Sequence, residues 1–240
     1  ISPQEKKSIE RRPTENLAAY DLYLKARALR DFTLPNRDDR ITLLKAAVQL
    51  DAEFSAAWAM LGQFYSNAAR FDYINRASTV TSARAAIENA VRLAPDTSDT
   101  LVAQARYLTW VEKDYARAIP LLERVLSQSP NEPNAFAALA SIARFQGRAS
   151  DALNHLRKAS SLDAGNLFHV RLAIQQLEAG RRYDEARTER RKLMDSLPAS
   201  LTASYQIAFI SFEAGGSKRE VEQFFSALSE AEVKSTEVLR

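Results

Sequence analysis

Hydrophobic and polar positions along the chain fit pairs of short helices. Between Asn134 and Asp163 a first apolar face recurs at helical spacing, Gly147 interrupts it, and a second apolar face follows. The first face consists of Phe136, Leu139, Ala140 and Ala143, and the second of Ala152, Leu156 and Ala159. This pattern predicts a helix, a turn at the glycine, and a second helix.

The second-helix face returns along the chain at nearly constant intervals. Its other copies are Ala83, Ile87 and Ala90; Ala118, Leu122 and Val125; Ala186, Arg190 and Leu193; and Val221, Phe225 and Leu228. The last members of successive copies are 35, 34, 34 and 35 residues apart. An earlier copy at Leu44 and Ala47 precedes Ala90 by 43 residues, so that unit holds about nine extra residues.

Six helix-turn-helix units follow from this period. Their approximate ranges are 17–52, 55–95 with the insertion, 99–132, 133–166, 167–200 and 202–235. One such pair cannot bury its apolar face alone, so stacked neighbours are expected to share a continuous core. With only six glycines and eight prolines, the chain also lacks the turn residues of an all-β fold. We therefore predict an all-α solenoid over residues 14–240.

The period and several of its residues resemble the tetratricopeptide repeat (TPR). The clearest matches are Trp58, Leu61, Gly62 and Tyr65, then Gly147 with Ala152, and Gly180 with Tyr183 and Ala186. The resemblance implies a right-handed α-solenoid of TPR-type repeats. It also implies that the first helix of each repeat lines a concave surface, where a protein or peptide partner binds.

The amino-terminal end carries a second, narrower resemblance. Ser2-Pro3-Gln4-Glu5 reads as a capping box for a short helix to about Arg11, so residues 1–13 are expected to be a helix or linker from an upstream domain, and Thr14 a cap for the next helix. Residues 2–28 and the extended unit 62–95 are similar to the carboxy-terminal TPR region of bacterial multidomain signalling proteins with a TolB-like domain. In that family the output module is a winged-helix regulator, a class III adenylate cyclase or a serine/threonine kinase.

That resemblance implies that the chain is a partner-binding or sensory module of a longer protein. The compartment stays open: periplasmic if a transmembrane helix lies upstream, and cytoplasmic otherwise. No apolar run in the chain approaches the roughly 18 residues of a membrane helix, so direct membrane insertion is not expected.

Little in the sequence indicates catalysis. The absence of cysteine excludes thiolate nucleophiles, disulfides and thiolate metal sites. No phosphate-binding glycine loop, nucleophile elbow or paired-histidine metal motif occurs, and a turn or a close helix contact accounts for each glycine. His155 and His169 have no partner at metal-ligand spacing, so both are expected to be structural or solvent-facing. We expect no enzyme activity, cofactor or metal.

The repeat register places candidate partner-binding residues on the first helices. Some TPR proteins hold terminal carboxylates with lysine and asparagine at positions 5 and 9 of the repeat, but here position 5 is Ala59, Ala103, Ala137, Val170 and Gln206, so that clamp is not expected. The predicted groove residues are Gln63, Asn67, Tyr107, Trp110, Asn134, Arg144, Phe145 and Gln206. The rings among them beside Arg144 have the composition of a recognition hot spot, or they pack on neighbouring repeats.

Two alternative functions use other surfaces. The arginines Arg187, Arg190 and Arg191 could bind a polyanion such as a nucleic acid, unless interleaved acids such as Glu185 and Glu189 neutralise them on a solvated face. Nucleic acid is the less favoured partner because net charge is only +3. A homo-oligomer could form instead through the apolar positions Val170, Ile174 and Leu177.

The insertion in the second unit is the most irregular segment. It contains Phe71, Tyr73 and Ile74, whose large apolar side chains are unfavourable in water. They either extend the first helix and pack on a neighbour or contact a partner, and packing is the expectation.

Overall fold

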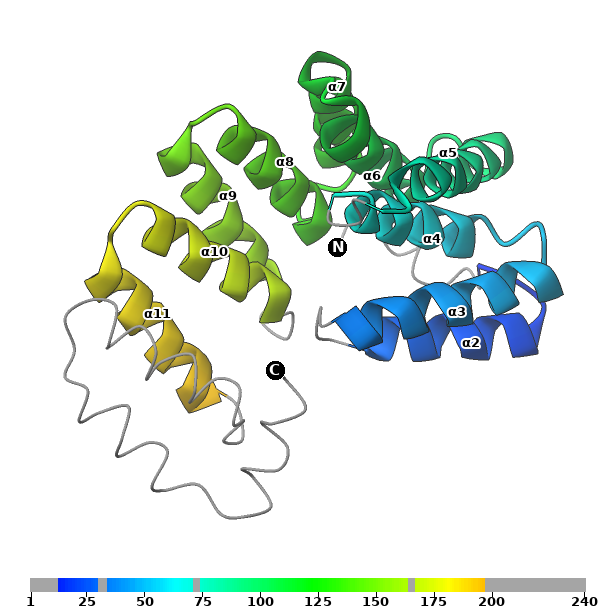
Figure 1. Ribbon diagram of the computed structural model, residues 1–240, viewed down its shortest axis with the longest axis horizontal. Helices are drawn as coiled ribbons and strands as arrows, with labels where there is room; N and C mark the ends of the chain where they lie inside the picture. Colours follow the sequence, from blue (N-terminus) through cyan, green and yellow to red (C-terminus); the bar gives the residue numbers. More distant parts are fainter. Residues whose placement is uncertain (1–12, 30–33, 71–73, 164–166, 197–240) are drawn as a thin grey trace, which may run out of the picture. The chain divides into compact units, whose positions relative to one another are not determined.

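The computed structural model describes residues 13–29, 34–70, 74–163 and 167–196 (Figure 1). Within these ranges the regular structure is entirely helical. The chain divides into two compact units, residues 1–169 and residues 170–240, which are treated separately. No helix in the described ranges combines the length and the apolar character needed to cross a membrane.

The described helices alternate as first and second members of successive pairs. The pairs are α2 (Leu17–Ala28) with α3 (Leu34–Leu50), α4 (Ser55–Ala68) with α5 (Arg76–Leu93), α6 (Ser98–Tyr107) with α7 (Tyr115–Gln128), α8 (Pro133–Phe145) with α9 (Ala149–Leu162), and α10 (Leu167–Ala179) with α11 (Tyr183–Ser196). A π-helical turn, η1 (Leu108–Glu112), continues α6. The predicted amino-terminal helix and the unit 202–235 lie outside the described residues.

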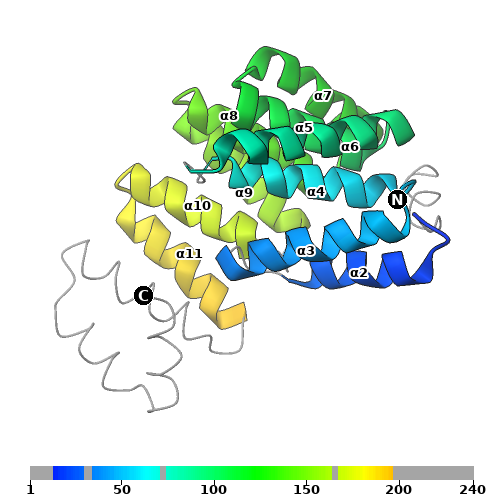
Figure 2. The same cartoon turned by 45° about the vertical axis from the view of Figure 1, so that its right-hand side comes forward.

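Packing in the first unit follows the order expected of stacked repeats. Helix α2 packs along α3, and the two lie side by side in both views (Figure 1, Figure 2). Helix α4 contacts both its partner α5 and the next first helix, α6, which in turn contacts α8. The first helices α4, α6 with η1, and α8 therefore form one surface, which we call the first-helix face.

The predicted second-helix faces are the buried faces. Side chains at most 6% exposed fill this position in α5, α7 and α9: Ala83, Ile87 and Ala90; Ala118, Leu122 and Val125; and Ala152, Leu156 and Ala159. The period read from the sequence is thus confirmed as the period of the core.

Helix α2 begins at a different cap from the one predicted. The side chain of Asn16, not Thr14, accepts the N-terminal hydrogen bond, from the backbone N–H of Ala19 at 3.1 Å. The Thr14 hydroxyl accepts from the backbone N–H of Asn16 at 3.0 Å and donates to the carboxylate of Asp51, so it joins the start of α2 to the end of α3.

The insertion does not lengthen the first helix of its pair. Helix α4 ends at Ala68, and the second helix, α5, has 18 residues where α7, α9 and α11 have 14. Ile74, just before α5, is 94% exposed, so the packing predicted for it is wrong. Phe71 and Tyr73 lie outside the described residues.

A left-handed backbone conformation recurs at the turn inside each of three pairs. Lys113, Gly147 and Arg181 have φ angles of 61°, 74° and 56°, and they are spaced 34 residues apart. Glycine adopts this conformation freely, whereas other residues are strained in it. In the fifth repeat the left-handed residue is Arg181. Gly180, the residue before it, therefore does not supply the left-handed conformation of this turn.

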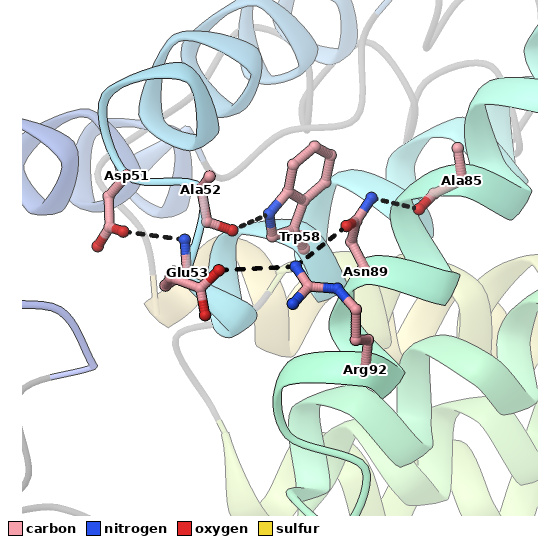
Figure 3. A network of polar contacts seen from close by, with 7 residues as sticks. All are labelled: Asp51, Ala52, Glu53, Trp58, Ala85, Asn89 and Arg92. Atoms are coloured by element: carbon pink, nitrogen blue, oxygen red, sulfur yellow. Dashed lines mark hydrogen bonds and ion pairs between the residues drawn. The ribbon is translucent and has the colours of Figure 1, made fainter.

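The motif tryptophan has a structural role. Trp58 donates its indole N–H to the carbonyl of Ala52 at 2.8 Å, which joins α4 to the turn after α3 (Figure 3). Nearby, Arg92 of α5 lies 3.7 Å from the carboxylate of Glu53, so the turn also contacts the second helix.

Candidate functional site

Two aromatic rings on the first-helix face are surrounded by cations. The rings are Trp110 in η1 and Phe145 at the end of α8. The guanidinium carbon of Arg70 lies 5.5 Å from the Trp110 ring centroid and 5.4 Å from that of Phe145. One cation thus bridges both rings. The cation–aromatic cluster, as we call it, consists of Arg70, Arg106, Trp110, Lys113, Arg144 and Phe145.

The other cations of the cluster each contact one ring. The guanidinium of Arg106 lies 5.6 Å from the Trp110 centroid. The ammonium of Lys113 and the guanidinium of Arg144 lie 4.7 Å and 5.3 Å from the centroid of Phe145. Such contacts are worth about 0.5–1 kcal/mol each at exposed sites, so the rings hold the cations in place without neutralising them.

Arg106 joins three consecutive first helices. It is only 8% exposed, and its guanidinium donates to Oε1 of Gln63 in α4 at 2.7 Å and to Oδ1 of Asn134 in α8 at 3.3 Å. Both acceptors are neutral amides. The charge of Arg106 is therefore positioned by hydrogen bonds to neutral groups, and among the described residues no carboxylate accepts a hydrogen bond from it.

Burial and like charges act on the cluster together. Burial lowers the pKa of Arg106 to about 10, although the charge of Glu132 acts in the opposite direction. Burial and the charge of Arg144 lower the pKa of Arg70 to about 10. The pKa of Lys113 is lowered by partial burial and by the charges of Arg70 and Arg76. All these groups remain protonated at neutral pH, so the region is strongly positive.

The nearest acids in the sequence are engaged elsewhere. Glu112 and Asp114, on either side of Lys113, lie 3.3 Å and 3.6 Å from Nη1 of Arg117. Within the described part of the chain, no carboxylate lies at ion-pair distance from Lys113 or Arg144. Within these residues the charges of Lys113 and Arg144 are therefore not compensated by an ion pair.

The predicted groove residues have several fates. Tyr107 and Trp110 are 5% and 4% exposed, so the packing interpretation holds for these two rings, and Tyr107 lies in a core with Ile87 and Ala103. Gln63 and Asn134 are ligands of Arg106. The remaining described candidates, Asn67, Arg144 and Phe145, are half-buried, and Gln206 lies outside the described residues.

Sequence reasoning missed Arg70, Arg106 and Lys113. Arg70 follows the end of α4, Lys113 follows η1, and Arg144 is next to last in α8. The pattern that could have revealed the cluster is that each of three consecutive first helices has a cation at its carboxyl end. The helix dipole favours positive charge there.

The alternative arginine face in the second unit is largely neutralised. Arg190 is 9% exposed and paired with Glu178, and Arg187 lies 3.6 Å from Asp184. The neighbouring Arg182 lies 2.6 Å from Glu185. Arg191 is exposed. This pattern fits the solvated, self-neutralised interpretation better than a polyanion site.

The proposed self-association surface and the two histidines are mostly buried. Ile174 and Leu177 are 3% and 1% exposed, so they form no exposed apolar patch. His169 is 1% exposed, and His155 is half-buried, with its ring 6.2 Å from that of Phe136. Both histidines are thus structural, and no group of three metal-ligating side chains occurs within the described ranges.

Comparison with known proteins relates the chain to tetratricopeptide repeats. A tetratricopeptide repeat family model matches residues 111–177. No curated protein matches the chain. The chain is 15% identical to the solved structure of TTC0263, a thermophilic TPR protein of Thermus thermophilus, with a TM-score of 0.61 and coverage of 81% of this chain and 100% of that one.

Two other solved structures have similar folds. PilW, a widely conserved type IV pilus biogenesis factor, is 14% identical with a TM-score of 0.55, over 92% of this chain and 99% of that one. The human IFIT1 dimer with PPP-AAAA is 20% identical with a TM-score of 0.60, over 87% of this chain and 49% of that one. At these identities the likeness concerns the fold. The helix pairs, the family match and these likenesses show that the chain has an all-α solenoid fold of the tetratricopeptide-repeat type.

Proposed function

We propose that the chain is a non-enzymatic scaffold that binds a protein partner on its first-helix face. TPR solenoids are in general scaffolds for protein interactions, and the cation–aromatic cluster is the observation that carries the proposal here. Arginine and aromatic side chains brought together on one surface are typical of binding hot spots. The half-buried Arg144 and Phe145 of α8 present this chemistry on the first-helix face, to which α4 with the half-buried Asn67 also belongs.

The proposed context is a larger bacterial signalling or regulatory protein, of which this chain is the carboxy-terminal partner-binding or sensory module. This finer assignment rests on the resemblance of residues 2–28 and of the extended unit 62–95. A neighbouring output domain in the same protein would support it.

The test compares a first-helix position with a second-helix position that bears the same residue type. Asn67→Tyr adds a neutral bulky ring to the first-helix face, and Asn154→Tyr adds the same ring to an exposed position of α9. Partners recovered from a bacterial lysate by the wild-type chain are identified by mass spectrometry. We expect the recovery of at least one specific partner to fall with Asn67→Tyr and to persist with Asn154→Tyr.

Equal recovery by both variants would contradict the assignment of binding to this face. Circular dichroism of each variant controls for folding. The polyanion alternative is separated by Arg187→Glu with Arg191→Glu, which should reduce binding to DNA only if that face is used. The likeness to IFIT1 with PPP-AAAA is one of fold and does not favour nucleic acid here. Sedimentation at two protein concentrations tests the self-association alternative.

A further inference from the structure

Lys113 and Arg144 of the cation–aromatic cluster lie close to Arg106, and within the described part of the chain neither of the two has a carboxylate at ion-pair distance. Arg106 is held by the Trp110 ring and by the neutral amides of Gln63 and Asn134. Lys113 and Arg144 share the ring of Phe145. Rings and amides set the positions of these charges but leave their sum unchanged, so the field of the cluster is available to an anionic ligand.

Two buried donors within the cluster also lack acceptors. The indole N–H of Trp110 and the Nε–H of Arg106 have no hydrogen-bond partner within the described part of the chain, and both residues are more than nine-tenths buried. The contrast with Trp58 is informative because its indole N–H is satisfied by a backbone carbonyl. Buried donors without acceptors are unfavourable and rare in folded proteins. A ligand with oxygen acceptors would therefore be stabilised at this site.

The turn residue Lys113 places its ammonium within the cluster. Its φ of 61° belongs to the conformation that glycine adopts at the equivalent Gly147. Lysine at this position is strained, yet its ammonium is placed over Phe145 and beside the other cations. The same strain occurs at Arg181, so it belongs to the turn of the repeat, and what distinguishes Lys113 is the position of its ammonium.

The shape of the cluster selects among anionic partners. Single-stranded nucleic acid is normally bound by stacking bases on open aromatic faces. Here Trp110 is 4% exposed, and the Phe145 ring is stacked with Tyr115 at 6.2 Å and covered by cations. No ring of the cluster is open for a base, whereas carboxylates need only the cations and the N–H donors.

We propose that the cation–aromatic cluster binds a short carboxylate-rich segment of a partner protein. The proposal rests on the scaffold function given above and names the chemistry of its partner. Carboxylate oxygens of adjacent Asp or Glu residues in the partner accept hydrogen bonds from Arg144 and pair with Lys113, and the buried Arg106 adds to the positive field. The site differs from a terminal-carboxylate clamp at repeat position 5, where this chain carries Ala59, Ala103 and Ala137.

The test measures the binding of fluorescein-labelled hexaglutamate by fluorescence anisotropy. Hexaglutamine is the uncharged control, and an oligothymidylate of equal charge is the nucleic-acid arm. Lys113→Glu reverses one charge of the cluster, and Lys158→Glu makes the same change at an exposed position of α9. Arg144→Gln is the second cluster variant, because it removes a charge without introducing an acid.

We expect hexaglutamate to bind the wild-type chain and hexaglutamine not to bind. Lys113→Glu and Arg144→Gln should each weaken binding by about tenfold or more, the size expected for a lost charged hydrogen bond, while Lys158→Glu changes it little. Raising the salt concentration from about 50 mM to about 200 mM should also weaken binding.

Three results would overturn the proposal: no binding of hexaglutamate at low salt, equal weakening by Lys113→Glu and Lys158→Glu, or tighter binding of the oligothymidylate. These results are separable from a failure of the scaffold function. If Asn67→Tyr abolishes partner recovery while hexaglutamate does not bind, the face binds a partner of other chemistry. If hexaglutamate binds as expected while Asn67→Tyr changes nothing, the anion site stands and the scaffold assignment fails.

Discussion

A Cβ atom at Gly62 would lie 2.5 Å from Cδ1 of Ile87, closer than side-chain carbons approach in folded proteins. Glycine at this position therefore allows α4 and α5 to pack at their observed separation. Gly62→Ala should destabilise the chain by about 1–3 kcal/mol, because the added methyl forces Ile87 or the helix to move. Urea unfolding measures the loss.

A matched control and a rescue sharpen this prediction. At Gly180 an added Cβ meets its nearest atoms only at 3.5 Å, so Gly180→Ala should change the free energy of unfolding by less than about 1 kcal/mol. Ile87→Val in the Gly62→Ala background should restore part of the loss. Equal effects at both glycines would show that close helix approach is not the cause.

At the left-handed turn positions, replacing glycine should lower the stability of the chain, and introducing glycine should raise it. Gly147 has open space around its Cβ position, so Gly147→Ala acts only through the backbone and should destabilise by about 1 kcal/mol. Arg181→Gly relieves the same strain and should stabilise by up to about 1 kcal/mol. Thermal unfolding of the two variants measures these changes in stability. A lower stability of Arg181→Gly would show that the backbone of Arg181 is not strained.

Lys113→Gly should separate stability from binding. Glycine relieves the strained φ but removes the contact with Phe145, so stability should stay the same or rise by up to about 1 kcal/mol. Hexaglutamate binding should weaken in the same variant because a cation is lost. A purely structural lysine would give the reverse outcome, with lower stability and unchanged binding.

His169 should make stability depend on pH. Burial, helped by the charge of Arg106, lowers the pKa of His169 to about 4, against about 6.5 in an unfolded chain, while Asp163 acts the other way. As the pH falls from about 6.5 toward 4, the unfolded chain takes up a proton that the folded chain does not. The contribution of His169 therefore lowers stability, by about 2 kcal/mol at pH 5 relative to pH 7.

Unfolding of His169→Gln at both pH values checks this sign and size. The variant should lose less stability between pH 7 and pH 5 than the wild-type chain does. His155→Gln is the control, since burial also lowers the pKa of the half-buried His155 but less strongly. An unchanged pH dependence in His169→Gln would contradict the assignment.

The sequence was sufficient to predict the fold but not the site. Apolar periodicity identified the buried residues of α5, α7 and α9 because burial in a repeat depends on local spacing. The sequence predicted the wrong capping residue for α2, because Thr and Asn both cap helices well; in the structure Asn16 is the cap, and the Thr14 hydroxyl donates to Asp51 instead.

The binding cluster needed the three-dimensional packing. Arg70, Arg106 and Arg144 are far apart in the sequence and meet only because α4, α6 and α8 stack. The register placed Tyr107 and Trp110 on the first helices, but it could not show that neighbouring repeats bury them. The sequence alone did not show that Arg70, Lys113 and Arg144 lie at the carboxyl ends of first helices, because the exact ends of those helices come from the structure.

Site-specific photo-crosslinking tests the central claim, binding at the first-helix face, most directly. A photoreactive phenylalanine analogue replaces Asn67 on this face or, as a control, Asn154 on α9, and each chain is irradiated in lysate with and without excess hexaglutamate. We expect a partner adduct from position 67 that hexaglutamate suppresses, and none from position 154. An adduct from position 154 alone, or equal adducts from both positions, would contradict it.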